Sequence, residues 1–330
     1  MSRDIRVGLY GSGRTAGELV AALKKTGYRL TAAVVHSPRR AGQDIGVLTG
    51  GDRIGLATVS DLARAVRSGR FDVLLYAGLA GERHQEAMAL CAAAGVHMVH
   101  ACFVHPLIAV DEELRGRLSE LAMSSGSRIV GTGMIPGLWL DVLPALLASA
   151  LPAPVRIRGR RASDISSWGS DVLVHELGVG SRLAGTATRI DLLLRESAHI
   201  IADALRLAGD RVESRGGLAM ASSDTVVGGV EVRAGEVEGF DQEVVVYENG
   251  AERIRLTWSG FAARTARGTA QGSDGGVELQ LLGADQSEIA VHVAAPLDPY
   301  PGTAARMVSA IGGLPALPPG LHPTTALPVG

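Results

Sequence analysis

The chain has 330 residues, of which 46% are hydrophobic and 20% charged, with 32 basic and 34 acidic side chains. This length is typical of about two domains, and the balanced charge argues against a nucleic-acid partner or an anionic membrane surface. The longest apolar stretch, residues 143–155, contains three prolines and is too short to span a bilayer. A strand-like run begins at Ile5 and leaves no room for a signal peptide, so we expect a cytoplasmic protein.

The first 135 residues alternate between predicted strands and predicted helices. Strands are expected at 5–10, 29–36, 72–76, 96–100 and 127–130, and helices at 14–25, 60–68, 82–94 and 111–124. This alternation predicts βαβ units around a parallel sheet, which is the doubly wound α/β architecture of a Rossmann domain.

The pattern changes after Gly137. Helices are expected at 138–150, 186–207 and 303–311, and strands at 230–237, 243–247, 253–258, 277–282 and 289–293. Asn249-Gly250 lies between two of these strands and indicates a two-residue hairpin. We therefore expect a Rossmann domain over 1–135, completed by about 300–330, and an α+β substrate-binding and dimerisation domain with an antiparallel sheet over 136–300.

Several catalytic classes are disfavoured by what the sequence lacks. The only lysines, Lys24 and Lys25, lie at the end of a predicted surface helix, which argues against a lysine Schiff base. Two cysteines, Cys91 and Cys102, are too few for a disulfide framework or a cysteine-based zinc site, and we expect no metal. The Walker A, G-x-S-x-G and H-E-x-x-H motifs are missing from the sequence.

A glycine-rich turn follows the first predicted strand. It has the form G-x-G-x-x-A and consists of Gly11, Ser12, Gly13, Arg14, Thr15 and Ala16. The first glycine permits a sharp turn, the second lets a pyrophosphate approach the backbone, and the small third residue lets helix and strand pack closely. The N–H groups at the start of the helix attract phosphate. The turn therefore predicts dinucleotide binding; the alternative is a purely structural glycine turn.

The end of the second predicted strand bears on the choice of cofactor. A carboxylate there would bind the ribose 2′-OH of NAD, but the segment His36-Ser37-Pro38-Arg39-Arg40 has none. Ser37 and Arg39, together with Arg14, suit a 2′-phosphate, because guanidinium groups match phosphate geometry. We therefore expect NADP, with NAD as the alternative if Arg39 and Arg40 are only solvated loop charges.

Three later loops follow strands whose carboxyl ends meet at one edge of the predicted sheet, where ligands bind in such folds. Ala77 and Gly78 are expected beside the nicotinamide ribose, and Gly133 is also assigned to the cofactor. Phe103, Met134, Ile135 and Pro136 are expected to line the substrate cleft. The alternative for the last loop is a tight turn between the domains.

Several segments together resemble the 2,4-diaminopentanoate dehydrogenase and native amine dehydrogenase family, which is related to dihydrodipicolinate reductase. They span nearly the whole chain, and the most specific is Gly131-Thr132-Gly133-Met134-Ile135-Pro136-Gly137; the others are 38–46, Asp141, 161–167, 234–239, 319–320 and 327–328. The resemblance implies a Rossmann domain, an NAD(P) cofactor, hydride transfer between an amine carbon and its imine, and a homodimer built through the second domain.

The sequence departs from this family in one loop. The resemblance implies a glutamate just after the strand ending at His100, which binds the amine and activates water or ammonia. Residues 101–106 read Ala-Cys-Phe-Val-His-Pro and contain no carboxylate. The paired-histidine and lysine motif of dihydrodipicolinate reductase is also missing, so dihydrodipicolinate is not the expected substrate.

Candidate proton donors are His105, in that loop, and Asp164, in the second domain. Their alternatives are a solvated loop histidine and a turn cap with Ser166. Trp168 and His175 are expected to bind substrate, although Trp168 would equally suit core packing.

These features predict an NADPH-dependent oxidoreductase that reduces the C=N bond of a small imine or iminium. Two alternatives stay open: an amine dehydrogenase acting on a small amine, and an NADP-binding sensor or scaffold protein without turnover.

Overall fold

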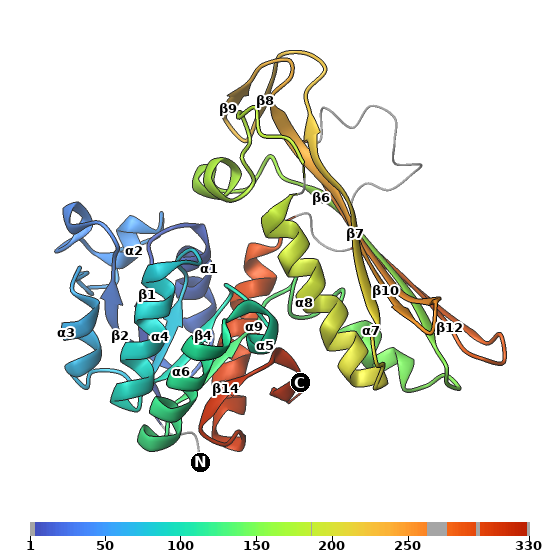
Figure 1. Cartoon of the computed structure of the whole chain (residues 1–330). Helices are drawn as coiled ribbons and strands as arrows, with labels where there is room; N and C mark the ends of the chain where they lie inside the picture. Colours follow the sequence, from blue (N-terminus) through green and yellow to red (C-terminus); the bar gives the residue numbers. More distant parts are fainter. Residues whose placement is uncertain (1–3, 186, 263–275, 295–297, 329–330) are drawn as a thin grey trace. The chain divides into compact units, whose positions relative to one another are not determined.

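The computed structural model describes residues 4–185, 187–262, 276–294 and 298–328 (Figure 1). The chain divides into two compact units, Met1–Gly137 with Pro299–Gly330 (unit 1) and Leu138–Asp298 (unit 2). The boundaries expected from the sequence, 135/136 and about 300, lie within two residues of these. Among the described residues, no helix is both long enough and apolar enough to cross a membrane.

Unit 1 is built on a parallel sheet of six strands in the order β14-β5-β4-β3-β1-β2. The strands are β1 (Arg6–Tyr10), β2 (Arg29–Val34), β3 (Val73–Tyr76), β4 (His97–His100), β5 (Arg128–Gly131) and β14 (Gly320–His322). Both faces of such a sheet are covered, so its strands read as nearly continuous apolar runs. This is why the first five strands were predicted correctly, to within two residues at each end.

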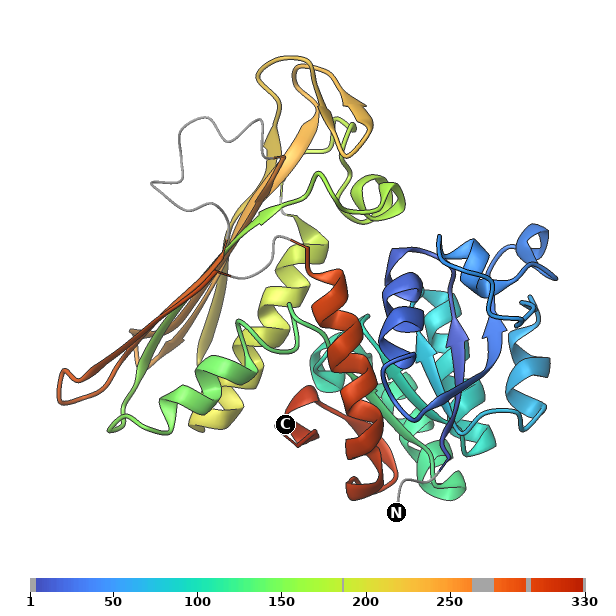
Figure 2. The same ribbon diagram turned by 180° about the vertical axis from the view of Figure 1, so that it is seen from behind.

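Helices cover both faces of the unit 1 sheet (Figure 2). Buried side chains of α3 (Leu62–Arg67), α4 (Glu82–Ala94) and α6 (Glu112–Ser125) form one hydrophobic core. Those of α1 (Arg14–Leu23) and α9 (Tyr300–Gly313) form the other. Helix α9 belongs to the C-terminal segment, so the last 32 residues, 299–330, complete unit 1.

Unit 2 contains a second six-stranded sheet, in the order β13-β12-β6-β11-β10-β7. The strands are β6 (Arg156–Asp164), β7 (Arg211–Met220), β10 (Val237–Glu248), β11 (Ala251–Phe261), β12 (Gly276–Leu282) and β13 (Glu288–Val293). Helices α7 (Val142–Ala148) and α8 (Thr188–Leu205) pack on this sheet. The fold class is confirmed, but the sheet is mixed rather than wholly antiparallel, because β6 runs parallel to β11.

Local sequence explains only part of unit 2. The hairpin at Asn249-Gly250 is confirmed: both residues have positive φ, 52° and 77°, as a type I′ turn requires. The strand predicted at 230–237 is wrong, because β9 ends at Val232 and β10 starts at Val237 after a turn. Among the described residues, β9 pairs only with β8 (Thr225–Val227). The first residue of the predicted helix 186–207, Thr186, lies outside the described residues.

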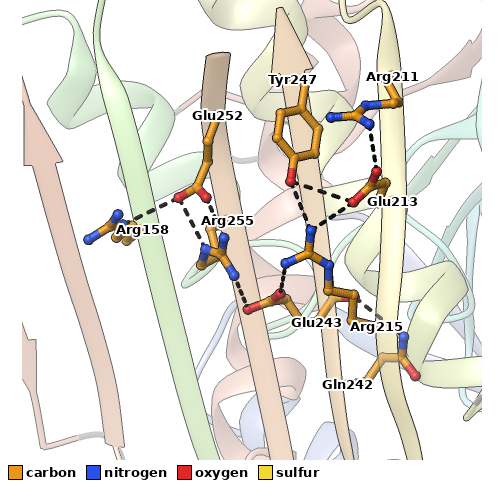
Figure 3. Close-up of polar contacts among 9 residues, drawn as sticks. All are labelled: Arg158, Arg211, Glu213, Arg215, Gln242, Glu243, Tyr247, Glu252 and Arg255. Carbon is orange, nitrogen blue, oxygen red and sulfur yellow. Dashed lines mark hydrogen bonds and ion pairs between the residues drawn. The ribbon is translucent and has the colours of Figure 1, made fainter. Parts of the chain in front are cut away.

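One face of the unit 2 sheet carries a chain of charges across four strands (Figure 3). Arg255 of β11 pairs with Glu243 of β10 at 2.6 Å and with Glu252. Arg215 of β7 contacts Glu243 at 3.7 Å and Glu213 at 2.8 Å. Adjacent side chains of opposite charge support the pairing of neighbouring strands on this face.

Candidate functional site: the strand ends of unit 1 and a buried arginine of unit 2

The turn between β1 and α1 requires glycine at its first position. Gly11 has a φ of 114°, which side-chain-bearing residues rarely adopt. A Cβ on Gly11 would lie 2.8 Å from the carbonyl oxygen of Ala77. The turn is fixed on both sides, since the Gly11 N–H donates to Val34 O and the Ala77 N–H donates to Tyr10 O, each at 2.8 Å. Ala77, a predicted cofactor residue, therefore lies directly against the turn.

The space around Gly13 is empty, whereas the space around Gly11 is filled by Ala77. It is the N-cap residue of α1, makes no side-chain cap, and a Cβ placed on it would meet no atom within 4 Å. The N–H groups of the first helical turn, at Arg14 and Thr15, have no carbonyl partner within the helix. Ala16 is fully buried and allows close packing of α1 on the sheet. This bare helix start fits the pyrophosphate of a dinucleotide.

The loop after β2 places one arginine beside this turn. Nη1 of Arg40 donates to the hydroxyl of Ser12 at 2.8 Å. Ser37, Arg39 and Arg40 lie at the 3-10 turn η1 (Pro38–Arg40), and both arginines are exposed. The sequence interpretation chose Arg39, whereas the structure joins Arg40 to the glycine turn. Adjacent arginines give no sequence signal for which of them contacts the glycine turn.

Asp44 is the next acidic residue along the chain, and its carboxylate binds backbone N–H groups. Its carboxylate accepts hydrogen bonds from the N–H groups of Gly46, Val47, Ile54, Gly55 and Leu56, at 2.7–3.3 Å. Desolvation opposes ionisation, but these N–H donors outweigh it and hold the pKa of Asp44 below its ordinary value. Asp44 therefore shapes the 44–56 loop, and the missing ribose carboxylate is not supplied from there.

Arg14 has an aromatic partner that the sequence did not reveal. Its guanidinium lies 4.7 Å from the ring centroid of Tyr300, the first residue of α9. A cation over an aromatic face is held there electrostatically. The C-terminal segment therefore contributes a side chain next to the predicted phosphate site.

The loop after β4 is buried, contrary to the cleft-lining role predicted for Phe103. The Phe103 side chain is only 6% exposed, and its ring packs edge-on against His100 with 4.4 Å between centroids. His105 is also buried, at 4% exposed, as the N-cap residue of a short helix. The alternative interpretation of His105 as a solvated loop histidine is therefore wrong.

Three potential metal-ligating side chains meet behind this loop, which the sequence analysis did not anticipate. One donor atom from each of His84, His100 and Cys102 lies within 4.8 Å of the others, and all three residues are buried. Nδ1 of His100 accepts the backbone N–H of Cys102 at 3.3 Å, so the ring proton is on Nε2. A ligand position at His100 would require this hydrogen bond to be given up. Burial lowers the pKa of His100, which keeps the ring neutral.

The loop after β5 is closed on itself. A Cβ on Gly137, whose φ is 129°, would lie 2.3 Å from the Gly133 nitrogen, and one on Gly133 would lie 3.0 Å from Pro136 O. These contacts favour the tight-turn interpretation of Gly133. Pro136 is buried and follows a cis peptide bond, while Met134 and Ile135 are half-buried.

The predicted residues of unit 2 are spread along one segment. Asp164 accepts the N–H of Ser166 at 2.9 Å, as in the alternative turn-cap interpretation. The Trp168 ring packs against two other aromatic rings, with 6.1 Å between its centroid and that of Trp258 and 6.4 Å between its centroid and that of Phe240. His175 is exposed on the π-helical turn η2 (Val172–Glu176), beside a hollow of about 330 Å³.

A buried arginine next to these aromatic rings was not predicted as a site residue. Arg161 is 2% exposed, its Nε donates to Ser163 Oγ at 3.1 Å, and that oxygen also accepts from Trp258 Nε1 at 2.9 Å. Among the described residues, Nη1 of Arg161 and Nε1 of Trp168 are buried without a hydrogen-bond partner. Burial lowers the pKa of Arg161 to about 10, so the group is a cation at neutral pH. Arg161 and Ser163 share one face of β6, and Asp164 lies on the other, because strand side chains alternate.

Comparisons with known proteins give the family and the fold of the chain. The family model of the 2,4-diaminopentanoate dehydrogenase C-terminal domain matches residues 138–330. The fold is similar to that of amine dehydrogenase from Mycobacterium smegmatis, with a TM-score of 0.81 and 23% identity over 99% of this chain and 97% of that chain. No curated protein sequence matches the chain.

Two further solved structures share the fold at lower similarity. A probable dehydrogenase from Thermotoga maritima has a TM-score of 0.62 and 14% identity over 98% of this chain and 92% of that chain. Biliverdin reductase from Synechocystis sp. PCC 6803, solved with biliverdin and NADP+, has a TM-score of 0.58 and 14% identity over 98% of this chain and 95% of that chain.

The family match, together with the parallel sheet and its bare glycine turn, defines an oxidoreductase of the dehydrogenase class. The match covers more than half of the chain. The protein belongs to the 2,4-diaminopentanoate dehydrogenase family, and the resemblance predicted from its sequence is confirmed.

Proposed function

We propose that this protein is an NADPH-dependent reductase of a small imine or iminium. The observation that carries the cofactor choice is the end of β2, where Arg40 hydrogen-bonds to Ser12 of the glycine turn and Asp44 is consumed by backbone N–H groups. Two exposed arginines with no free carboxylate at this position favour a 2′-phosphate over a 2′-hydroxyl. Ser37, Arg39 and Arg40 would hold the phosphate, and the start of α1 would hold the pyrophosphate.

The proposed substrate carries an anionic group. Arg161 is a buried cation with no carboxylate partner among the described residues, and a charge in such a place is costly until a counter-charge reaches it. The indole N–H of Trp168 offers a second buried donor in the same aromatic cluster. A carboxylate is the simplest anionic group that pairs with a guanidinium.

Reduction of a preformed C=N bond requires few acid or base groups from the protein. Bound NADPH supplies a hydride to the imine carbon. His105 is proposed to hold the proton that the nitrogen receives; Asp164, with its Asx turn, is the second candidate. The loop after β4 offers no carboxylate to activate ammonia or water, which favours imine reduction over reductive amination.

The test is a steady-state assay of NADPH oxidation with matched substrates. We expect turnover of a cyclic imine carrying a carboxylate, weaker turnover of the same ring without it, and none with the corresponding ketone and ammonia. Efficient use of ketone plus ammonia would instead support the amine dehydrogenase alternative. Tight NADPH binding without turnover of any of these substrates would support the sensor alternative.

The proposal includes a homodimer formed through unit 2. Helices cover one face of its sheet, whereas the other carries the alternating Arg and Glu side chains of Figure 3, which can pair with a second copy of themselves. Sedimentation equilibrium would test this, with a monomer mass in low salt contradicting it.

A further inference from the structure

The loop that follows β3 is held from within by two side chains. The Tyr76 hydroxyl donates to the carbonyl oxygen of Leu79 at 3.1 Å. The Cys102 thiol donates to the carbonyl oxygen of Gly78, with 3.6 Å between sulfur and oxygen. Cys102 is itself oriented by its backbone N–H, which donates to Nδ1 of His100. Two successive carbonyl groups of one loop are thus turned toward the interior of unit 1.

The loop cannot shift further toward Tyr76 and Tyr10. A Cβ on Gly78 would lie 2.7 Å from the Tyr76 hydroxyl oxygen and 2.9 Å from Cε1 of Tyr10. The Tyr10 and Tyr76 rings are stacked, with centroids 4.6 Å apart and planes 9° from parallel. Burial raises the pKa of Tyr76, so its hydroxyl keeps the proton that it donates. The loop therefore rests on a rigid aromatic pair with a defined orientation.

The orientation of these carbonyls fixes the opposite side of the loop. In a trans peptide unit the C=O and N–H groups point in opposite directions, and the cis bonds among the described residues lie elsewhere. The inward carbonyls of Gly78 and Leu79 therefore turn the N–H groups of Leu79 and Ala80 outward. Both residues are exposed, Leu79 by 43%. Neither N–H has an acceptor in the part of the chain that the structure describes.

The position of the loop assigns a ligand to these donors. A dinucleotide lies across the point where the strand order reverses, here between β1 and β3. Its adenine half lies toward β2, where the 2′-position is bound, so its nicotinamide half lies toward β3. The N–H groups of Leu79 and Ala80 are on that side.

We propose that the backbone N–H groups of Leu79 and Ala80 bind an oxygen acceptor in the nicotinamide half of the cofactor, and that Tyr76 and Cys102 are the positioning residues that aim them. The inference rests on the proposed use of NADPH. It concerns only the nicotinamide half, so it makes a prediction that cofactor binding at the glycine turn alone does not.

The experiment compares two probes on the full-length chain, NADPH and 2′,5′-ADP, which contains only the adenine half. Dissociation constants are measured by fluorescence for NADPH and by calorimetry for 2′,5′-ADP. Tyr76→Phe and Cys102→Ala are each expected to weaken NADPH binding about fivefold, the equivalent of one lost hydrogen bond. Binding of 2′,5′-ADP is expected to stay at the wild-type value. Cys91→Ala, which removes the other buried thiol of unit 1, and Tyr28→Phe are the matched controls and should change neither constant.

The outcomes separate this inference from the proposed function. If the wild type binds neither probe, the choice of cofactor is wrong. If the wild type binds both and the two variants bind NADPH as tightly as it does, the positioning role is wrong. Equal losses for both probes would show general damage to unit 1 and would also contradict the inference.

Discussion

Nη1 of Arg40 lies 2.8 Å from the hydroxyl oxygen of Ser12, and this contact joins the loop after β2 to the glycine turn after β1. Ser12 is the residue between the two glycines that the proposed pyrophosphate site requires. The contact therefore holds a guanidinium at the place where the strand ends of β1 and β2 meet. Arg39, its neighbour, is exposed.

Replacing these arginines should change the cofactor preference. Arg40→Ala and Arg39→Ala each remove one charge-assisted contact to the proposed 2′-phosphate, which contributes about 1.5–3 kcal/mol. We expect NADPH to bind about 10–100-fold more weakly, while NADH binding changes little because NADH lacks that phosphate. Titration of both nucleotides checks this, with Arg117→Ala on the exposed face of α6 as the control. A parallel loss for NADH would contradict the assignment.

The two glycines of the turn should respond differently to a methyl group. Gly13→Ala meets no atom within 4 Å and should leave thermal stability near that of the wild type, but its Cβ would occupy the approach of the pyrophosphate, so NADPH binding should be lost. Gly11→Ala should lower the melting temperature, because φ is 114° and Ala77 O is 2.8 Å away. Gly116→Ala, inside α6, is the control for an added methyl group and should not lower the melting temperature, because alanine is favoured over glycine in a helix. A Gly13→Ala protein that binds NADPH normally would show that no pyrophosphate lies there.

Unit 1 could be predicted from sequence because its elements are specified locally. Its buried strands are short apolar runs, and its helices end at capping residues such as Gly95 and Gly126, both left-handed. The position of the glycine turn followed from the same pattern. What could not be predicted was which of Arg39 and Arg40 contacts the glycine turn, or that Tyr300 lies against Arg14.

Unit 2 was harder because its interior contains polar residues where a strand pattern expects apolar ones. The buried positions of β6 are Ile157, Gly159, Arg161 and Ser163. Three arginines, at 156, 158 and 160, alternate with the first of them on the other face. The segment has the two-residue period of a β-strand, but the strand is hard to recognise because Gly, Arg and Ser occupy its buried positions. The same feature concealed the site, since a run of four arginines in nine residues, 156–164, reads as a solvated surface.

Arg161 should lower the stability of unit 2 but be needed for turnover of the anionic substrate. Its replacement by methionine removes a buried cation that has no carboxylate partner and keeps a similar volume, so we expect the free energy of unfolding of unit 2 to rise by about 1–3 kcal/mol. The same variant should lose turnover of the carboxylate-bearing imine while keeping the weak turnover of the neutral one. Urea denaturation and kcat/KM for both substrates provide the two measurements.

Arg158→Met is the matched control for that experiment, because Arg158 lies on the same strand but on the exposed face, where it contacts Glu252 at 3.4 Å. It should neither stabilise unit 2 nor change the ratio of the two substrates. If Arg161→Met is less stable than the wild type and keeps its preference for the anionic substrate, Arg161 is a structural cation and the proposed substrate class is wrong.

Glu252 should make unit 2 sensitive to acid. A hydrogen bond from Arg255, together with the charges of Arg255 and Arg158, holds the pKa of Glu252 below its ordinary value of 4.5 (Figure 3). A carboxylate with a depressed pKa in the folded state stabilises the fold above the unfolded-state pKa, and this stabilisation is lost as the pH falls through the folded-state value.

Glu252→Gln should therefore lower the urea midpoint of unit 2 at pH 7, and its difference from the wild type should shrink steadily below about pH 4.5. Glu231→Gln, on the exposed part of β9, is the control and should show no such pH-dependent difference. A deficit of Glu252→Gln that stays constant from pH 7 to pH 3 would mean that the charge of Glu252 contributes nothing to the stability of unit 2.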